Sequence, residues 1–220
     1  MIIDELVYQI TSHFGFTPTP EQAEAIRTFS SFMMNRDPHA IMILRGSAGT
    51  GKTSLAAAIV QTMISLGQKV VLLAPTGRAA KVFSLSSGYP AFTIHHQIYI
   101  QKTFSSDGGS FNLNFNRHTD TLFMVDESSM IANQGFTDSA FGTGHLLDDL
   151  IQFVYSGRNC RMVLIGDQAQ LPPVGETESP ALQTCVIEGY GLQVFENNLN
   201  EVLRQSQQSG ILFNATQIRN

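Results

Sequence analysis

The sequence predicts an α/β fold in which a parallel sheet is covered by helices on both faces. Short apolar runs that are typical of buried strands alternate with longer segments of helical periodicity. The strand runs are almost continuously apolar, as expected where both faces of a parallel sheet are buried. The 220 residues, 43% of them hydrophobic, are enough to bury a full core of this kind.

Two helices are predicted before the first strand. In residues 2–16, apolar side chains recur at positions 3, 6, 7, 10 and 14, which is helical spacing. A second helix opens in residues 17–33, with Thr19 as its N-cap and Pro20 at the first helical position. Thr19 and Gln22 also have the spacing of a capping box, in which each side chain binds the other residue's backbone.

The rest of the chain alternates strands with helices. Strands are predicted at 40–44, 69–74, 121–127, 161–167 and 192–196, and helices at 54–66, 76–85 and 145–156. Gly67 ends the first of these helices. We interpret Asp148 and Asp149 as solvent-facing side chains of the last helix, and Met33 and Met34 as core residues.

A β-hairpin is predicted to interrupt this alternation at residues 98–117. Two candidate strand segments flank Ser105–Ser110. In the second of them, polar residues alternate with Phe111, Leu113 and Phe115. The predicted organisation is therefore a main domain, residues 1–97 and 118–220, with the hairpin inserted. Within the main domain, residues 132–144 have the composition of an irregular loop.

Charge and composition exclude several classes of protein. A formal charge of −5 argues against a protein that coats nucleic acid by bulk charge, so a polyanion would need a local patch. No run approaches the roughly 18 apolar residues of a membrane helix, and the N-terminus lacks the basic start of a signal peptide. Cys160 and Cys185 do not form a disulfide framework or a metal-ligand pattern. We expect a cytoplasmic protein without a membrane partner.

The clearest chemical motif is GSAGTGKT, Gly46–Thr53, between a predicted strand and a predicted helix. It fits G-x-x-x-x-G-K-[ST], in which backbone N–H groups and the helix N-terminus cradle phosphates. Lys52 would reach the β- and γ-phosphates, and the Thr53 hydroxyl would bind Mg²⁺. The motif predicts ATP and Mg²⁺ as ligands. The predicted nucleotide-binding residues are Gly46, Ser47, Ala48, Gly49, Thr50, Gly51, Lys52, Thr53 and Ser54.

An acidic pair follows the strand predicted at 121–127. Asp126 emerges at the carboxyl end of that strand, where a carboxylate would hold Mg²⁺. Glu127 could orient and deprotonate water. Because this pair favours hydrolysis over transfer to a bound acceptor, it indicates an ATPase rather than a kinase.

A third motif, GDQAQLPPVG, follows the strand predicted at 161–167. Gln170 stands just ahead of Pro172 and Pro173, where its amide could bind the γ-phosphate or the attacking water. The prolines stiffen the backbone, so that a displacement caused by a change at the phosphate would be transmitted along the chain rather than absorbed by it.

Taken in order, these motifs resemble those of superfamily 1 helicases, in the RecD, Dda and Pif1-like group that moves 5′ to 3′ on DNA. GSAGTGKTS is similar to motif I, VDESSM to motif II, GDQAQLPPVG to motif III, and APTGRAAK (74–81) to motif Ia. TIHH (93–96) resembles the short T-I-H element of the group, and LNEVLRQ (199–205) resembles motif IV. The resemblance covers residues 17 to 205 and implies a RecA-like P-loop NTPase domain, the first motor domain (1A).

The resemblance also implies roles for residues outside the phosphate loop. Gln22 would read adenine; the capping box is the structural interpretation of the same residue, and both can hold together. Arg204 would contact the γ-phosphate, with a solvated surface charge as the alternative. Pro75, Thr76 and Arg78 would contact the backbone of single-stranded DNA, although Thr76 could instead only cap a helix.

Two further assignments stay open. His95 or its neighbour His96 would face DNA, with a packed, partly buried histidine as the alternative. The hairpin occupies the position of the group's small domain 1B, which splits the duplex. Its Lys102 and Arg117 could meet phosphates, and Phe104, Phe111 or Phe115 could stack on a base, unless these aromatics are buried in a structural ribbon.

The group's second RecA-like domain (2A), with motifs V and VI, is not found in these 220 residues, of which 16 follow Arg204. The implied partners are single-stranded DNA or a forked duplex, and a second RecA-like domain in a longer chain. We expect the 220 residues alone to be nearly inactive. The alternative function is a nucleotide-gated nucleic-acid-binding module that does not translocate.

Overall fold

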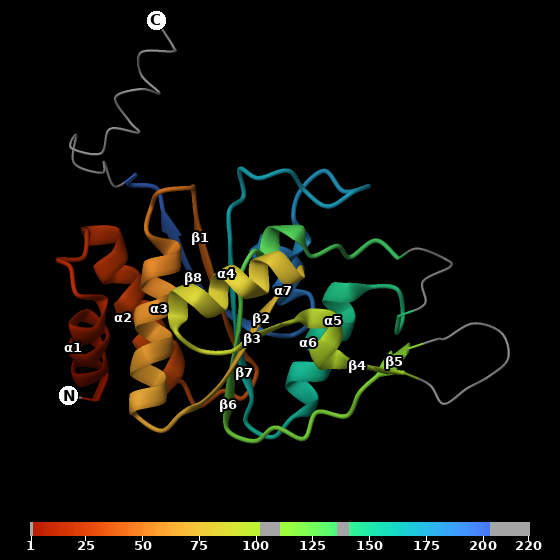
Figure 1. Cartoon of the computed structure of the whole chain (residues 1–220), viewed down its shortest axis with the longest axis horizontal. Coiled ribbons are helices and arrows are strands. Elements are labelled where there is room, and N and C mark those ends of the chain that lie inside the picture. The colour runs from red at the N-terminus through yellow and green to blue at the C-terminus, as the bar shows by residue number, and fades with distance from the viewer. Residues whose placement is uncertain (1, 102–110, 136–140, 203–220) are drawn as a thin grey trace, which may run out of the picture.

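The structure is a computed structural model that describes residues 2–101, 111–135 and 141–202. In this part of the chain, six strands form one parallel sheet in the order β3-β2-β6-β7-β1-β8 (Figure 1). The strands are β1 (Ala40–Gly46), β2 (Lys69–Ala74), β3 (Ala91–Thr93), β6 (Thr121–Val125), β7 (Arg161–Gly166) and β8 (Gln193–Leu199). The predicted α/β fold with a parallel sheet is confirmed.

Helices cover both faces of the sheet, and each face has its own core. Against one face pack α1 (Ile2–Phe14), α2 (Pro20–Met34), α3 (Lys52–Ser65) and α4 (Gly77–Ser87). Against the other pack α5 (Ile94–Ile98), α6 (Leu146–Ser156), α7 (Thr184–Glu188) and the 3-10 helix η2 (Pro180–Leu182).

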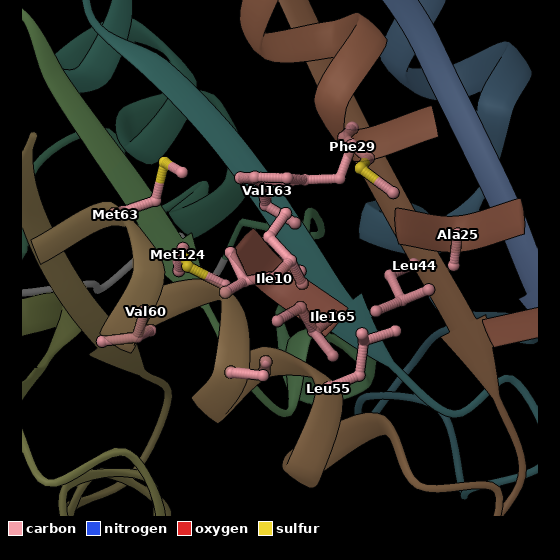
Figure 2. Close-up of a cluster of buried hydrophobic side chains, with 14 of the residues drawn as sticks. Ile10, Ala25, Phe29, Leu44, Leu55, Val60, Met63, Met124, Val163 and Ile165 are labelled. Atoms are coloured by element: carbon pink, nitrogen blue, oxygen red, sulfur yellow. The ribbon is translucent and has the colours of Figure 1, made fainter. Parts of the chain in front are cut away.

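The strand β1 shows why its sequence is continuously apolar. Met42 and Leu44 point into the core beneath α1–α4, whereas Ile41 and Ile43 point into the opposite core. Because successive side chains of a strand alternate between faces, both sets must be apolar. Figure 2 shows the first core, where side chains of α1, α2 and α3 pack on those of β1, β6 and β7.

The predictions fail mainly at the two edges of the sheet. β3 was not predicted, because its three residues are too few to form an apolar run. β8 continues beyond the predicted residue 196 through polar residues to Leu199. An edge strand has a neighbour on one side only, so it is less completely covered and tolerates polar side chains. At the end of α2, Met33 packs on the core as predicted, but Met34 is 43% exposed, so its assignment to the core was wrong.

The described part of the inserted hairpin is a short antiparallel pair, β4 (Tyr99–Gln101) and β5 (Phe111–Leu113). Phe111 stacks on Phe141 at 4.6 Å between ring centroids, and the Gly142 N–H donates to the Phe111 carbonyl at 2.8 Å. The ring is therefore packed at the base of the hairpin, which favours a structural role for it. Phe115 and Arg117 are exposed, and Lys102 and Phe104 lie outside the described residues.

The interpretation of Asp149 as solvent-facing was wrong. Its carboxylate is fully buried and accepts hydrogen bonds from the Tyr99 hydroxyl (2.7 Å) and from the Thr143 N–H and hydroxyl (both 3.0 Å). Asp148 is half-buried and accepts from the Tyr190 hydroxyl. Periodicity placed both acids on an outer face, but residues 141–143 fold over that face and supply hydrogen-bond donors to Asp149.

Asp149→Ala is expected to lower the free energy of unfolding by about 3 kcal/mol, because the buried hydroxyl of Tyr99 and the two donors of Thr143 lose their acceptor. Urea unfolding followed by circular dichroism measures the change. Gln152→Ala, an exposed change on the same helix, should stay within about 0.5 kcal/mol of wild type. Equal stabilities of the two variants would contradict a structural role for Asp149.

Among the described residues, no helix combines the length and apolar character that a membrane crossing requires.

Candidate active site

The order of the strands brings the three predicted motifs together. β6, β7 and β1 are adjacent and parallel, so the loops that follow them all leave the sheet at the carboxyl ends of the strands. Between these loops lies a cleft of about 330 Å³. It is lined by Ala48, Gly49, Gly51, Lys52, Thr53, Ser54, Asp126, Glu127, Gly166, Asp167 and Gln170.

The glycines of the phosphate loop are required by its backbone. Gly49 and Gly51 have φ angles of 83° and 85°, in the left-handed region that favours glycine. At Gly46, a Cβ would lie 2.7 Å from the carbonyl oxygen of Leu199, which is too close for any side chain. The loop therefore runs tightly beside the end of β8 and turns into α3.

Lys52 is held over the loop by the loop's own carbonyls. Its ammonium donates to the carbonyl oxygens of Gly46 and of Ser47, the latter at 2.9 Å. The N-cap of α3, Gly51, supplies no side-chain hydrogen bond to the first turn. Free N–H groups at a helix N-terminus beside an ammonium form an environment suited to phosphate.

The acidic pair, Asp126 and Glu127, also lines the cleft. Burial raises the pKa of the Asp126 carboxyl to about 6, although the Glu127 N–H donates to its Oδ1 at 2.9 Å. Asp126 and the Thr53 hydroxyl line the same cleft, and they are an oxygen-donor pair that Mg²⁺ would accept together with phosphate oxygens. A divalent cation would also offset the cost of a charged, buried Asp126, so these residues fit the ion.

Glu127 adopts a left-handed backbone conformation with φ 53°. Such a conformation is uncommon for a residue other than glycine and carries strain of about 1 kcal/mol or more. The strained residue directs the chain from β6 into the 3-10 helix η1 (Ser128–Met130).

Gln170 is connected directly to the segment that follows the acidic pair. The Ser129 hydroxyl donates to Gln170 Oε1 at 2.9 Å. Since this bond uses the amide oxygen, the N–H groups of Nε2 remain able to bind a phosphate oxygen or water. Ser129 was not predicted as a site residue, although two serines directly follow Asp126 and Glu127 in the sequence.

A second contact joins the same two segments. The carboxylate of Glu176, three residues beyond the proline pair, accepts the backbone N–H groups of Asn133 and Gln134, the latter at 2.7 Å. The loop after β7 is therefore attached to the chain after β6 at two points. In contrast, Leu171 and Val174 between these points are 89% and 86% exposed.

Gln22 is outside the cleft lining and is almost fully buried, at 1% exposure. The Gln22 side-chain Oε1 accepts the backbone N–H of Thr19 at 3.0 Å, and the backbone N–H of Gln22 donates to the Thr19 hydroxyl. The capping box is therefore present. Its Nε2 donates to the carbonyl of Thr50 in the phosphate loop at 2.9 Å. The predicted contact with adenine stays a prediction.

The residues predicted to bind DNA are not among those that line the cleft. Pro75 is half-buried, and Thr76 caps α4 by accepting the Ala79 N–H at 3.2 Å. Arg78 is exposed in the first turn of that helix. Arg204 lies outside the described residues.

His95 is a packed histidine. Its ring lies 5.1 Å from that of Phe141 and 5.6 Å from that of Tyr99, and burial lowers its pKa. This environment agrees with the packed alternative. His96 is exposed and stacks on Phe92 at 5.6 Å.

Known proteins similar to this chain point to one group. The AAA domain family matches residues 17–220. The ATP-dependent RecD2 DNA helicase of Deinococcus radiodurans is 32% identical over 136 residues, which are 62% of this chain and 16% of that protein. The ATP-dependent DNA helicase dda of Enterobacteria phage T4 is 29% identical over 185 residues, 80% of this chain and 37% of that protein.

The fold agrees with these similarities. The Pif1 helicase from Candida albicans superposes with a TM-score of 0.56 at 20% identity, over 93% of this chain and 44% of that one. The chain thus spans less than half the length of each of these relatives. It belongs to the AAA domain family, as a RecA-like P-loop domain of the RecD, Dda and Pif1-like helicase group.

Proposed function

We propose that this chain is the ATP-binding and ATP-hydrolysing motor domain of a RecD-like DNA helicase, which couples Mg-ATP hydrolysis to movement on single-stranded DNA. The main support is the single cleft lined by Lys52, Thr53, Asp126, Glu127 and Gln170, which come from three separate motifs.

In the proposed reaction, the phosphate loop binds the triphosphate and Lys52 exchanges its carbonyl partners for the β- and γ-phosphate oxygens. Thr53 and Asp126 would hold Mg²⁺, which when bound would neutralise charge on the phosphates. Glu127 accepts a proton from water as the water oxygen attacks the γ-phosphorus. The bond from that phosphorus to the bridging oxygen breaks, leaving ADP and phosphate. Arg204 would stabilise the charge on the transferred group.

Gln170 would report the state of the γ-phosphate. Its amide is held by Ser129, and the stiff loop beyond it is attached through Glu176 to the chain after η1. A displacement at Gln170 would therefore move this loop and its exposed side chains as a unit. These exposed side chains suit contact with a second RecA-like domain, which we propose as a partner in the full-length protein.

For DNA, we propose that Pro75, Thr76 and Arg78 contact the backbone of one strand and that the hairpin lies at the fork. The alternative, a nucleotide-gated binding module without translocation, would use the same contacts. Only movement along DNA separates the two functions.

The test is ATP turnover by the full-length protein with and without single-stranded DNA, together with displacement of a streptavidin block from a DNA end. A helicase motor gives DNA-stimulated turnover and displacement, whereas a binding module binds DNA in response to nucleotide but displaces nothing. We expect the 220 residues alone to bind Mg-ATP and to turn it over slowly, because an arginine of a second motor domain contributes strongly to this type of hydrolysis. Helicase-like turnover by the 220 residues alone would contradict that expectation.

A further inference from the structure

Arg45 is a buried arginine that directly precedes the phosphate loop. It lies near the end of β1, two residues after Ile43, so its side chain points to the same face of the sheet, where α5, α6 and α7 pack. Only 8% of this side chain is exposed. Because a guanidinium taken out of water is costly unless its N–H groups are paired, and the rest of β1 is apolar, the acceptors have to come from other elements.

All three nitrogen atoms of the Arg45 guanidinium have acceptors. Nε donates to the carbonyl of Leu182 at 2.7 Å, and Nη2 donates to the Thr184 hydroxyl at 2.6 Å. Nη1 donates to Glu196 Oε2 at 2.8 Å and makes a longer bond of 3.4 Å to Asn198. Hydrogen bonds from Thr184 and Arg45 lower the pKa of Glu196, so this carboxylate is charged at neutral pH. The end of β1 is therefore fixed to β8 and to the segment that contains η2 and α7.

The carbonyl of Leu182 is shared with the loop that carries Gln170. Gln168 Nε2 donates to the same oxygen at 3.3 Å. The Gln170 N–H donates to the Asp167 carbonyl at 3.2 Å, so Gln168 and Gln170 belong to one turn. Leu182 Cδ1 would be 2.8 Å from a Cβ at Gly166, so Leu182 also packs on the strand end from which this turn starts. Leu182 thus joins the end of β1 to the turn of Gln170.

We propose that Arg45 is a positioning residue for ATP hydrolysis, which holds the Leu182 carbonyl and thereby sets the place of Gln170 relative to the phosphate loop. This inference rests on the proposed function, in which Lys52 and Gln170 both bind the γ-phosphate. The parallel pairing of β1 and β7 ends at Arg45 and Gly166, so the sheet itself does not fix the distance between the two loops that follow. The shared carbonyl connects them beyond that point.

A purely structural role makes a different prediction. A buried arginine that only satisfies neighbouring acceptors contributes to stability, so its loss would destabilise the protein without slowing hydrolysis by the molecules that are folded. Its effect would also be independent of Gln168, which is exposed and is not among the residues that line the cleft.

The experiment measures steady-state ATP hydrolysis and Mg-nucleotide affinity in the full-length protein with single-stranded DNA, at a temperature where every variant is folded. Arg45→Met is expected to lower kcat about tenfold and to change the nucleotide Kd less than about threefold, since misplacing a group by about 1 Å costs up to about 10²-fold in rate. Arg161→Met is the matched control. Arg161 donates to the carbonyls of Phe32 and Asn35 at the amino end of β7, so its loss should lower stability and leave kcat unchanged.

A second variant of Arg45 keeps its charge. Lysine lacks the planar fork that reaches Leu182, Thr184 and Glu196 together, so Arg45→Lys should also lower kcat. It takes the place of Arg45→Met if that variant does not fold.

Gln168→Ala tests the shared carbonyl through an exposed side chain. It should lower kcat about threefold, a smaller effect because its hydrogen bond is between neutral groups. In this background Arg45→Met should cause a smaller loss than in wild type, because residues of one hydrogen-bond network are not additive. Gln152→Ala, an exposed glutamine on α6, is the control and should retain wild-type kcat.

Hydrogen exchange follows the turn without relying on turnover. The amides of Ala169 and Gln170, which both donate to Asp167, should exchange faster in the Arg45 variant than in Arg161→Met. A wild-type kcat for the Arg45 variant or for Gln168→Ala, additive losses in the double variant, or equal exchange in the two arginine variants would each overturn the inference. A wild-type protein that binds nucleotide but does not hydrolyse it would instead refute the proposed function.

Discussion

Lys52→Ala should lower the affinity for Mg-ATP roughly 100-fold while the fold stays intact. The hydrogen bonds of a charged group contribute up to about 3 kcal/mol, and each 1.4 kcal/mol is a factor of ten in affinity. The side chain contacts the carbonyls of Gly46 and Ser47 rather than the core, so its loss removes little packing.

Thermal and urea unfolding with increasing Mg-ATP measure this effect. At a ligand concentration 100 times the wild-type Kd, binding stabilises the wild-type protein by about 2.7 kcal/mol, whereas the variant should gain about 0.4 kcal/mol. Lys69→Ala is the charge-matched control. Lys69 begins β2, so it lies at the amino ends of the strands, whereas the cleft lies at their carboxyl ends, and its ammonium donates to the Thr119 hydroxyl. Equal stabilisation of Lys52→Ala and wild type would remove Lys52 from the nucleotide site.

The buried centre of the fold was predictable because its chemistry is visible along the chain. β1, β2, β6 and β7 are covered on both faces, so each appears as an apolar run whose bounds agree with the structure within about two residues. The edge strands β3 and β8 depend on pairing with a neighbour instead of on their own hydrophobicity. Their limits were therefore missed or misplaced.

The same distinction applies to the site. Motifs I, II and III are each visible as a continuous stretch of sequence after a strand. The order of the parallel strands then places all three at the carboxyl ends of the sheet. Contacts between segments leave no comparable pattern: the bond from Ser129 to Gln170, the bond from Gln22 to Thr50 and the burial of Asp149 each depend on a loop from elsewhere in the chain. For such polar residues, helical or strand periodicity alone cannot tell a solvated side chain from a buried one with partners.

The left-handed backbone of Glu127 also had no signal in the sequence, and it bears on the second large prediction. Glycine or asparagine would occupy this conformation with less strain. The glutamate therefore occupies this position at a cost in stability, which agrees with a role for its carboxylate in the cleft that it lines.

Glu127→Gln is accordingly expected to slow ATP hydrolysis by about 10²–10⁴-fold in the full-length protein with single-stranded DNA, and to leave nucleotide affinity within a few fold of wild type. Glutamine keeps the size of the side chain and its place beside Asp126 but cannot accept the proton from the attacking water. Glu188→Gln, an exposed change of the same kind on α7, controls for loss of charge and should retain full activity. Single-turnover hydrolysis and equilibrium binding of a fluorescent nucleotide separate the two effects. If hydrolysis by Glu127→Gln matched that of Glu188→Gln, the general base would have to be another group. If affinity and rate fell together, Glu127 would act in binding the nucleotide instead of in activating water, because a base that acts only in the transition state leaves ground-state affinity unchanged.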